Sequence, residues 1–477
     1  MSAEGEFDLV IIGGGPAGYV GAIRAAQLGG SVAVVEKDSW GGTCLNRGCI
    51  PSKALIHAVE ALEIARDAKA FGITFGEPRV DWEGIRKAKT RAVKQLVSGV
   101  EMLLDGNGVA KFVGQARLLS PNDVQVTLAD GSPTMIRGRK VLLATGSTPL
   151  LPPIPGLDSP GVFSSDEAVD LPGPFTTLAV VGAGALGCEF AYIYAQLGTK
   201  VSLFEMLPQI APTEDADVAE VVDRAMRKKG VHVHVGTRVL GVRNAEGRKH
   251  VEYECEGECA VGEYDAILVA VGRQAAIRDI GLEEVGVETD RPGIKVNEKL
   301  ETNVAGVYAA GDCLRGAGLA HLASHEAVAA VENALGDGGH VNYDCVPACI
   351  FSRPEIGRVG MTEKEARAAG RAISVGSFPF SANSRAAATR QREGLVKLIA
   401  DAESGQILGG AVVGPCASEL VSALAVAVEM GATADEVADT IQSHPTFAEA
   451  IHEAALCLLG RPLHVPPVGK KDPGRGD

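Results

Sequence analysis

Apolar runs that end in glycines recur along the chain and predict buried parallel strands, each followed by a helix. Residues 7–12, FDLVII, form such a run, and the sequence AGYVGAIRAAQLG after it predicts a helix. A second apolar strand, SVAVVE, follows that helix. Such runs lack polar alternation, which is typical of strands covered on both faces. The same order returns at 178–205, LAVVGAGALGCEFAYIYAQLGTKVSLFE, so we expect an internal repeat of one βαβ unit.

The pattern changes at two proline-rich crossings and again in the last quarter of the chain. We place a boundary at 149–157 and 171–175, PLLPPIPGL and LPGPF. Apolar strands at 265–272 and 307–312 are expected to return the chain to the first domain. After about residue 346, a hairpin is predicted at 394–414 and helices such as ASELVSALAVAVEMG follow it, which indicates a separate α+β domain.

Composition and charge narrow the classes of protein that this chain can be. Its 477 residues are enough for two or more domains. A formal net charge of -15 argues against binding to nucleic acid or to an anionic membrane. The chain has no apolar run of eighteen or more residues, so no membrane helix is expected, and its first residues lack the features of a signal peptide. These features predict a cytoplasmic protein, or one in a mitochondrial or plastid matrix if a transit peptide has been removed.

Each βαβ unit contains a G-x-G-x-x-G turn directly after its first strand and an acidic residue at the end of its second. These glycines permit a tight turn, close approach of a pyrophosphate and tight packing of helix on strand, while the acid can accept hydrogen bonds from ribose. The helix N-terminus offers free N–H groups to the anion. The predicted dinucleotide residues are Gly13, Gly15, Gly18 and Glu36 in the first copy and Gly182, Gly184, Gly187 and Glu205 in the second. Two such sites suggest hydride transfer between two bound nucleotides, and Glu205 favours NAD over NADP.

The stretch GGTCLNRGCIPSK holds Cys44 and Cys49 five positions apart. Two such residues on a regular helix have Cα atoms about 8.7 Å apart, whereas a disulfide usually needs less than about 7 Å. The backbone must therefore bend if the two bridge, and Gly41, Gly42 and Gly48 could permit the bend. A metal site, a structural staple and a redox pair are all conceivable. A metal is disfavoured because other ligands are missing nearby, and a bridge across so short a loop suits reversible exchange better than stabilisation.

The sequence resembles a known family, the flavin disulfide reductases, and within that family the dihydrolipoamide dehydrogenases. GGTCLNRGCIPSK is similar to their redox-active disulfide, while FPFSANSRAAATRQREGLVKLIAD and SHPTFAEA are similar to their interface domain. The resemblance extends from about residue 6 to 465. It implies FAD in the first βαβ module, NAD in the second, and a homodimer.

The resemblance also implies roles for individual residues. Cys44 would exchange with the dithiol substrate and Cys49 would lie against the flavin. Lys53, near the flavin, would pair with Glu189, while Glu449 would orient the base His444. The FAD residues implied are Gly13, Gly15, Gly18, Glu36, Thr43, Lys53, Gly114, Asp312 and Ala320. The NAD residues implied are Gly182, Gly184, Gly187, Glu189, Glu205, Val239 and Gly272. No metal site is predicted.

The predicted architecture is α/β, with two Rossmann-like dinucleotide-binding domains and a C-terminal α+β dimerisation domain. The predicted segments are an FAD domain at 1–149, an NAD domain at 150–274, an FAD-completing segment at 275–346, an interface domain at 347–465 and a flexible tail at 466–477. The sequence departs from the family pattern at Gln442, at Arg353 and in GRQAAIRDIG after residue 271. None of these departures removes a redox group.

The function implied is NAD-dependent oxidation of a dihydrolipoyl group carried by a partner protein. That carrier would belong to a 2-oxo-acid dehydrogenase complex or to the glycine cleavage system. Alternatives are a related reductase of the glutathione or mercuric type, or a redox-sensing flavoprotein. Glu205 disfavours the NADPH that glutathione reductase uses, and mercuric reductase would need a C-terminal cysteine pair where this chain has Cys457 alone.

Overall fold

The computed structural model describes residues 5–291, 293–314, 318–336 and 338–466. The predicted tail at 466–477 lies outside the described residues except for residue 466. The chain forms two compact units. The first comprises residues 1–152, 163–174 and 271–341, and the second comprises 153–162, 175–270 and 342–477.

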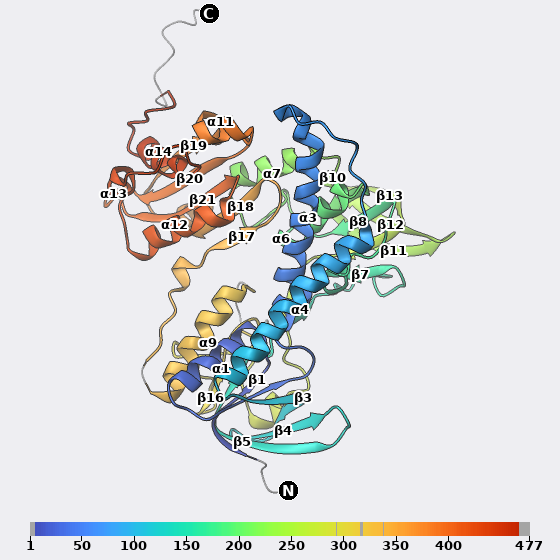
Figure 1. Ribbon diagram of the computed structural model, residues 1–477, viewed down its shortest axis with the longest axis vertical. Helices are drawn as coiled ribbons and strands as arrows, with labels where there is room; N and C mark the ends of the chain where they lie inside the picture. The colour runs from blue at the N-terminus through green and yellow to red at the C-terminus, as the bar shows by residue number, and fades with distance from the viewer. Residues whose placement is uncertain (1–4, 292, 315–317, 337, 467–477) are drawn as a thin grey trace, which may run out of the picture. The chain divides into compact units, whose positions relative to one another are not determined.

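The first unit is built on a six-stranded sheet (Figure 1). Its strands are β1 (Glu6–Ile12), β2 (Val32–Glu36), β3 (Ala110–Leu118), β4 (Asp123–Leu128), β5 (Pro133–Leu143) and β16 (Val307–Ala309). β1 pairs in parallel with β2 and β5, and β16 pairs in parallel with β5. β4 is antiparallel to both β3 and β5. The predicted first βαβ unit is confirmed, with α1 (Pro16–Gln27) between β1 and β2.

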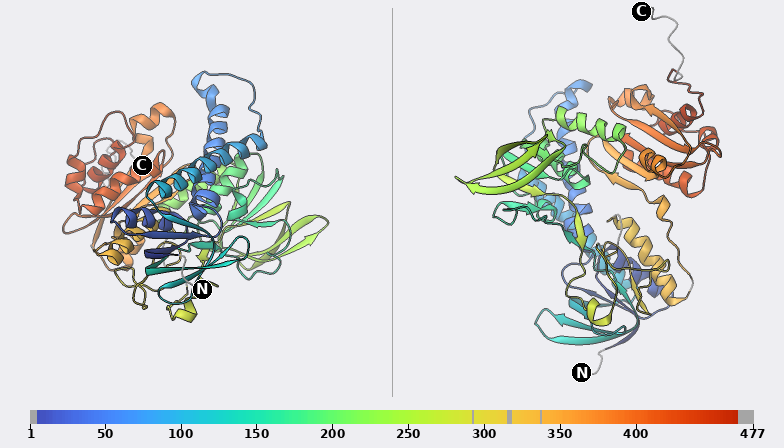
Figure 2. Two further views of the ribbon diagram at one scale, coloured as in Figure 1. Left: turned by 60° about the horizontal axis from the view of Figure 1, so that its bottom comes forward. Right: turned by 180° about the vertical axis from the view of Figure 1, so that it is seen from behind.

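Helix α9 (Ala320–Leu335) packs along α1 beside this sheet, as Figure 2 shows from two further sides. Small residues permit the contact, since a Cβ added at Gly21 would lie 3.2 Å from Leu142 and 3.4 Å from Ala327. The remaining elements of this unit are α2 (Gly42–Arg47), α3 (Cys49–Asp67), η1 (Ala68–Phe71), α4 (Trp82–Gly106), β6 (Ser147–Pro149), α5 (Ser165–Ala168), β15 (Arg273–Ala275) and α8 (Leu282–Val285).

The second unit contains the repeated βαβ module. Its sheet has the order β10-β9-β8-β14-β7, with β7 (Val162–Ser164) at one edge. The other strands are β8 (Thr177–Val181), β9 (Lys200–Phe204), β10 (His232–His234) and β14 (Ala266–Val269). Helix α6 (Ala185–Gln196) joins β8 to β9, as predicted. β14 still belongs to this sheet, so the chain rejoins the first sheet only at β16.

A three-stranded antiparallel sheet is inserted before β14. It comprises β11 (Thr237–Ala245), β12 (Arg248–Cys255) and β13 (Glu258–Tyr264). Helix α7 (Ala216–Lys228) precedes β10. A core cluster that includes Phe204, Val239 and Tyr264 lies between the inserted sheet and the parallel one.

The C-terminal part of this unit is a five-stranded antiparallel sheet with helices (Figure 1). The sheet has the order β17-β18-β21-β20-β19, and the predicted hairpin is β20 (Leu395–Asp401) with β21 (Ile407–Gly414). Its other strands are β17 (Ala348–Ile350), β18 (Glu355–Gly360) and β19 (Ile373–Pro379). The helical elements are η2 (Tyr343–Cys345), α10 (Glu363–Ala368), η3 (Phe380–Ala382), α11 (Ser384–Thr389), α12 (Ala417–Glu429), α13 (Ala434–Asp439) and α14 (Glu449–Leu458). The predicted α/β class with an additional α+β part is confirmed.

Candidate functional site

The first glycine turn has the geometry that its sequence predicts. Gly13 has a φ of +110°, and a Cβ added at Gly18 would lie 1.8 Å from the Gly13 carbonyl oxygen. The third glycine therefore lets α1 begin directly against the end of β1. The Glu36 carboxylate accepts the backbone N–H groups of Gly14 at 2.7 Å and Asp38 at 2.8 Å, which fixes it beside the turn.

The second glycine turn repeats this arrangement at the level of single atoms. Gly182 has a φ of +98°, and a Cβ added at Gly187 would lie 1.9 Å from the Gly182 carbonyl oxygen. The Glu205 carboxylate accepts the N–H groups of Ala183 at 2.8 Å and Leu207 at 2.9 Å. In both copies the acid lies 22 residues after the N–H group that it accepts within the turn. The two copies therefore share the same hydrogen bonds between the acid and the backbone, as well as the same sequence pattern.

The two cysteines lie on different helices, because the helical path breaks between them. Helix α2 ends at Arg47 and α3 begins at Cys49, with Gly48 between them. A Cβ added at Gly48 would lie 3.1 Å from the carbonyl oxygen of Thr43. The two thiols can approach each other only if the backbone bends between them. That bend is present at Gly48, one of the glycines expected to permit it. Gly42 brings this segment against the first glycine turn, since a Cβ there would lie 2.6 Å from the Gly15 Cα.

The two cysteine side chains interact, and this interaction changes the acidity of Cys44. A hydrogen bond to the Cys49 side chain, burial and the charge of Cys49 together hold the pKa of the Cys44 thiol far above its ordinary value. Lys53, one turn beyond Cys49 on α3, acts in the opposite direction with a smaller effect. In this arrangement Cys44 is therefore a weaker acid than an ordinary cysteine thiol.

Asp312 lies in a network of side chains at the end of the first sheet. Its carboxylate accepts a hydrogen bond from the Ser147 hydroxyl at 2.7 Å. Arg273 donates to the Ser147 hydroxyl at 2.8 Å and to the Ser147 carbonyl at 2.9 Å, and it pairs with Asp166 at 2.7 Å. The Arg273 guanidinium thus holds Ser147 in place, and Ser147 in turn holds the Asp312 carboxylate.

The surroundings of this network fit an FAD. The hydroxyl oxygen of Thr145 is buried without a hydrogen-bond partner in the described structure, so a polar group is expected beside it. Gly311 lies between α1 and α9, since a Cβ there would lie 3.3 Å from Ala17 and 3.2 Å from Ala323. Its N–H donates to the buried Glu326 carboxylate at 2.7 Å. The start of α1 after the glycine turn supplies free N–H groups for a pyrophosphate.

The other predicted FAD residues lie in the same unit. Gly114 lies on β3 one residue after Val113, which pairs with Glu36. A Cβ at Gly114 would lie 2.3 Å from the Thr127 carbonyl oxygen, so strands β3 and β4 approach closely there. Thr43 lies on α2, Lys53 lies on α3, and Ala320 is the first residue of α9. The structure thus places these residues on elements of one unit, and their contacts with FAD remain predictions.

The predicted NAD residues are divided between the units. Glu189 is a buried residue of α6, and its carboxylate accepts the Phe351 N–H at 3.1 Å. Val239 is 6% exposed in the core, and its contact with a nucleotide remains a prediction. Gly272 has a φ of +127° and belongs to the first unit, as do Cys44 and Lys53. Glu189 and His444 belong to the second, so the predicted Lys53–Glu189 pair and the approach of His444 to Cys44 remain predictions.

His444 and Glu449 form the predicted pair. The Nδ1 atom of His444 lies 2.8 Å from a carboxylate oxygen of Glu449, while the other oxygen accepts the Thr446 N–H at 2.8 Å. Burial raises the pKa of Glu449, but the Thr446 N–H, the hydrogen bond to His444 and nearby imidazoles outweigh it and lower that pKa. The His444 side chain is 67% exposed, which leaves Nε2 accessible to a thiol.

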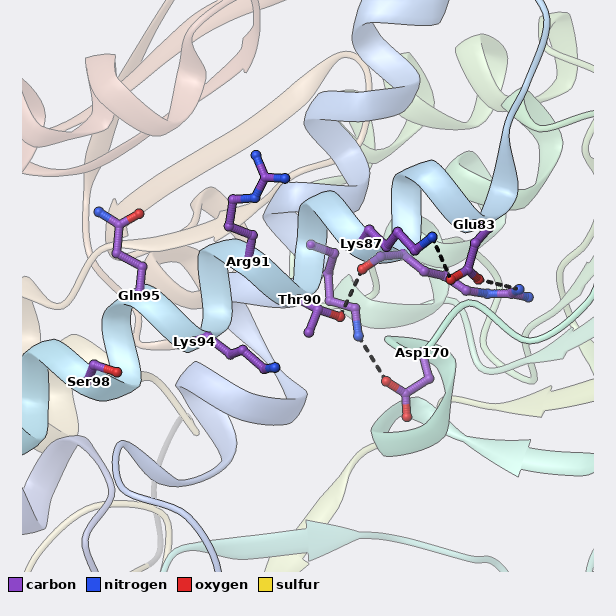
Figure 3. A pocket seen from close by; sticks show the side chains of 10 residues that line it. Glu83, Lys87, Thr90, Arg91, Lys94, Gln95, Ser98 and Asp170 are labelled. Carbon is purple, nitrogen blue, oxygen red and sulfur yellow. Dashed lines mark hydrogen bonds and ion pairs between the residues drawn. The ribbon is translucent and has the colours of Figure 1, made fainter.

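A cavity of about 850 Å³ runs along α4 (Figure 3). Lys89 pairs there with Asp170 at 2.9 Å, and Arg86 donates to the carbonyls of Leu171 and Gly173. The full lining is Glu83, Arg86, Lys87, Lys89, Thr90, Arg91, Lys94, Gln95, Ser98 and Asp170. This lining includes none of the predicted site residues.

Metal-binding clusters and membrane-spanning helices are both absent from the part of the chain that the structure describes. No group of three or more His, Cys, Asp or Glu side chains is arranged to hold a metal ion. No described helix combines the length and the apolar character that crossing a membrane requires.

Sequence reasoning missed Thr145, Ser147 and Arg273. The signal for the first two was present, since VLLATGS is an apolar run ending at the same sheet edge as the glycine turn. Arg273 had no local signal, because its partner Ser147 lies 126 residues earlier in the chain.

Comparisons with known proteins agree with this geometry. Residues 7–327 match the family model described as pyridine nucleotide-disulphide oxidoreductase, and residues 346–455 match the dimerisation domain of that family. The chain is 40% identical to the mitochondrial dihydrolipoyl dehydrogenase of Pisum sativum, over 97% of this chain and 94% of that protein. It is 38% identical to the dihydrolipoyl dehydrogenase of Bacillus subtilis, over 96% and 99%. Among solved structures it is similar to LpdA of Mycobacterium tuberculosis, with a TM-score of 0.87, 31% identity and coverage of 94% and 99%.

Proposed function

This chain belongs to the pyridine nucleotide-disulphide oxidoreductase family, and from that premise we propose that it is an NAD-dependent dihydrolipoyl dehydrogenase. It uses FAD and NAD as cofactors. The observation that carries the proposal is the pair of hydrogen-bonded cysteines, Cys44 and Cys49, at the α2–α3 break beside the first glycine turn. A protein-bound dihydrolipoyl group is the dithiol that such a pair would oxidise.

The reaction begins from the oxidised cysteine pair. A thiolate of the dihydrolipoyl group attacks Cys44 Sγ, which breaks the Cys44–Cys49 bond and releases Cys49 as a thiolate. The second substrate thiol then displaces Cys44, so the substrate leaves as a cyclic disulfide and both cysteines are reduced. A bound FAD would supply the two-electron redox chemistry that connects the reduced cysteine pair to NAD⁺, the final hydride acceptor. The net products are the lipoyl disulfide, NADH and one proton.

His444 is the base that removes the proton from the substrate thiol in the first of these reaction steps. A thiol with a pKa of about 8.5 is mostly protonated near neutral pH, and the thiolate is the nucleophile. The Glu449 carboxylate faces Nδ1 at 2.8 Å, so Nε2 is the nitrogen left to accept the substrate proton. The same carboxylate stabilises the imidazolium that results.

Glu205 is proposed to select NAD. Two backbone N–H groups fix its carboxylate at the end of β9, where the 2′-hydroxyl of a ribose would be recognised. A 2′-phosphate at the same place would meet a fixed negative charge. The nucleotide contacts of Val239 and Gly272 are proposed with this site.

The assembly is proposed to be a homodimer formed through the part of the chain that matches the dimerisation domain. Its partner is proposed to be a lipoyl-bearing carrier of a 2-oxo-acid dehydrogenase complex or of the glycine cleavage system. The division into segments at 149, 274, 346 and 465 is part of this proposal. A cytoplasmic or organellar matrix location suits it, because reducing compartments keep such thiols in exchange.

A direct assay tests the function. Purified protein is mixed with dihydrolipoamide and either NAD⁺ or NADP⁺, and absorbance at about 340 nm follows the reduced nucleotide as it forms. We expect turnover with NAD⁺ and little with NADP⁺. Efficient reduction of glutathione disulfide by NADPH, without oxidation of dihydrolipoamide, would instead assign the chain to another reductase of the family.

A further inference from the structure

Helix α14 contributes the carboxylate of a second histidine–carboxylate pair, one turn beyond the carboxylate of the pair already described. Glu453 follows Glu449 by four residues, so the two carboxylates lie on the same face of the helix. The Nδ1 atom of His464 lies 2.7 Å from a carboxylate oxygen of Glu453. Glu453 is 3% exposed, whereas the His464 side chain is 68% exposed.

The two pairs are bonded in the same way. In each, one carboxylate oxygen faces a histidine Nδ1 and the other accepts a backbone N–H group. For Glu449 that group is the N–H of Thr446 at 2.8 Å, and for Glu453 it is the N–H of His464 itself at 3.3 Å. Both carboxylates therefore have fixed positions, and α14 presents two acids, each bonded to an imidazole from a segment outside the helix.

Two carboxylates one helical turn apart repel each other, and a buried one needs a compensating charge. His464 can supply that charge to Glu453 when it is protonated. Its field also reaches the first pair, since it contributes to the lowered pKa of Glu449, after the larger effects of burial, the Thr446 N–H and His444. Cys457, on the same helix, has its pKa raised by burial and by the charge of Glu453.

The elements packed on α14 do not provide an alternative compensating charge among the described residues. β19 has no charged side chain. On β20, Lys397 pairs with Asp215, Asp217 and Glu363, and Asp401 bonds Ser404 and Arg371. On α13, Asp435 pairs with Arg461, Glu436 accepts from Thr433, and Asp439 is exposed. The other titratable side chains of α14 are Cys457 and His452, and the buried Nδ1 of His452 has no hydrogen-bond partner among the described residues.

We propose that His464 is a positioning residue for the base: held by the buried Glu453, its imidazolium balances the second negative charge on α14 and thereby sets the pH range in which His444 accepts a proton. The proposal rests on the proposed function, which makes His444 the base. It identifies a feature of this chain that the cysteine and glycine motifs do not include.

The test compares three variants through the pH dependence of kcat/KM for dihydrolipoamide. In His464→Gln the Glu453 charge is left uncompensated, which favours the protonated form of His444, so the acid limb should move to higher pH. We expect a shift of about half a pH unit, less than the 1–3 units of a charge in direct contact. On the acid limb this is a loss of roughly threefold at fixed pH. His464→Lys should restore the wild-type midpoint, and Glu453→Gln should move it to lower pH.

A second measurement separates this proposal from the function on which it rests. The ring protons of His444, assigned through their loss in His444→Gln, can be titrated by NMR in the full-length protein without any substrate. The same order of midpoints is expected there, even if dihydrolipoamide is not the substrate. His232→Gln, on β10, is the matched control and should leave the midpoint unchanged. The proposal is wrong if His464→Gln lowers thermal stability without moving the His444 midpoint, or if His464→Lys does not restore the wild-type midpoint. Glu453 and His464 would then only anchor the chain after α14.

Discussion

The two cysteines lie close together, and we propose different roles for them. Cys44 hydrogen bonds to Cys49, and that bond together with burial raises the pKa of Cys44. We propose that Cys49 is the thiolate beside the flavin in the reduced pair and that Cys44 is the thiol that exchanges with the substrate. The break at Gly48 places the two side chains on separate helices.

Single substitutions of the cysteines should separate these roles. Cys44→Ser leaves Cys49 as a thiolate beside the flavin, so a long-wavelength absorption band should be present without any reductant. Cys49→Ser should lack that band, and both variants should lose dihydrolipoamide oxidation. Absorption spectra of the two purified flavoproteins provide the measurement, and a band in Cys49→Ser alone would show that the roles are reversed.

Glu205 should determine the choice of nucleotide. A carboxylate facing the 2′-phosphate of NADP in a confined site costs roughly 1–3 kcal/mol at intermediate dielectric, so NAD should be preferred tenfold to a hundredfold or more in affinity. Steady-state kinetics with both nucleotides measure the preference. Glu205→Ala should reduce the preference for NAD, mainly by improving the use of NADP. Equal efficiency of the wild-type protein with NAD and NADP would refute the assignment.

Local geometry could be predicted where a motif is short, whereas contacts between residues distant in sequence could not. The two glycine turns and their acids are read within 22 residues of sequence, and the structure bears out their geometry. Ser147 and Asp312 are 165 residues apart, and Arg273 reaches Ser147 across 126. No periodicity encodes such contacts, because they depend on where strands end in the folded sheet.

At the level of elements, a buried lysine connects helices and strands of the second unit. Lys397 on β20 lies within 3.2 Å of Asp215, 3.0 Å of Asp217 and 2.7 Å of Glu363, and its side chain is 4% exposed. Burial lowers its pKa, but the hydrogen bonds to Glu363 and Asp217 and the charges of both aspartates outweigh burial and raise it. The Lys397 and Arg367 partners lower the pKa of Glu363.

These shifts give a signed dependence of stability on pH. The contribution of Glu363 is present above its unfolded value of about 4.5 and is lost as pH falls through the lower folded value. The contribution of Lys397 is present below about 10.5 and is lost as pH rises through the higher folded value. Lys397→Met should therefore cost roughly 2–4 kcal/mol of unfolding free energy near pH 7, below the range for fully buried pairs because Asp217 is half exposed.

Urea unfolding at several pH values checks this. The gap in unfolding free energy between wild type and Lys397→Met should narrow below about pH 4.5, as Glu363 takes up a proton. Lys364→Met, an exposed position on α10, is the control and should change little. A gap that is constant from pH 4 to pH 8 would contradict the electrostatic account.

Two arginines of α4 should differ in their effect on stability. Arg86 donates to the carbonyls of Leu171 and Gly173, so Arg86→Met leaves these acceptors unpaired and should cost about 1–3 kcal/mol of unfolding free energy. Arg91, on the same helix in Figure 3, has no ion pair with any residue that the structure describes. Arg91→Met should change the urea midpoint little, and equal effects of the two substitutions would contradict this reading.

At the scale of the whole molecule, the cysteines and the base lie in different compact units of the chain. Cys44 belongs to the first unit and His444 to the second, and residues 346–455 match a dimerisation domain. We therefore expect the active site to be shared, with His444 of one chain serving Cys44 of the other. His444→Gln should reduce dihydrolipoamide oxidation by about a hundredfold or more, as loss of a general base does.

A mixed dimer tests the sharing directly. Homodimers of Cys44→Ser and of His444→Gln should both be nearly inactive, since each site lacks one group. When the two chains are combined in one dimer, a shared geometry places both lesions in one site and leaves the other intact. About half of the wild-type activity per dimer should then return, and differently tagged chains allow the mixed species to be purified before assay. If each chain instead formed its own site from its own Cys44 and His444, every site in the mixed dimer would still carry one lesion and the activity would stay near that of the two homodimers.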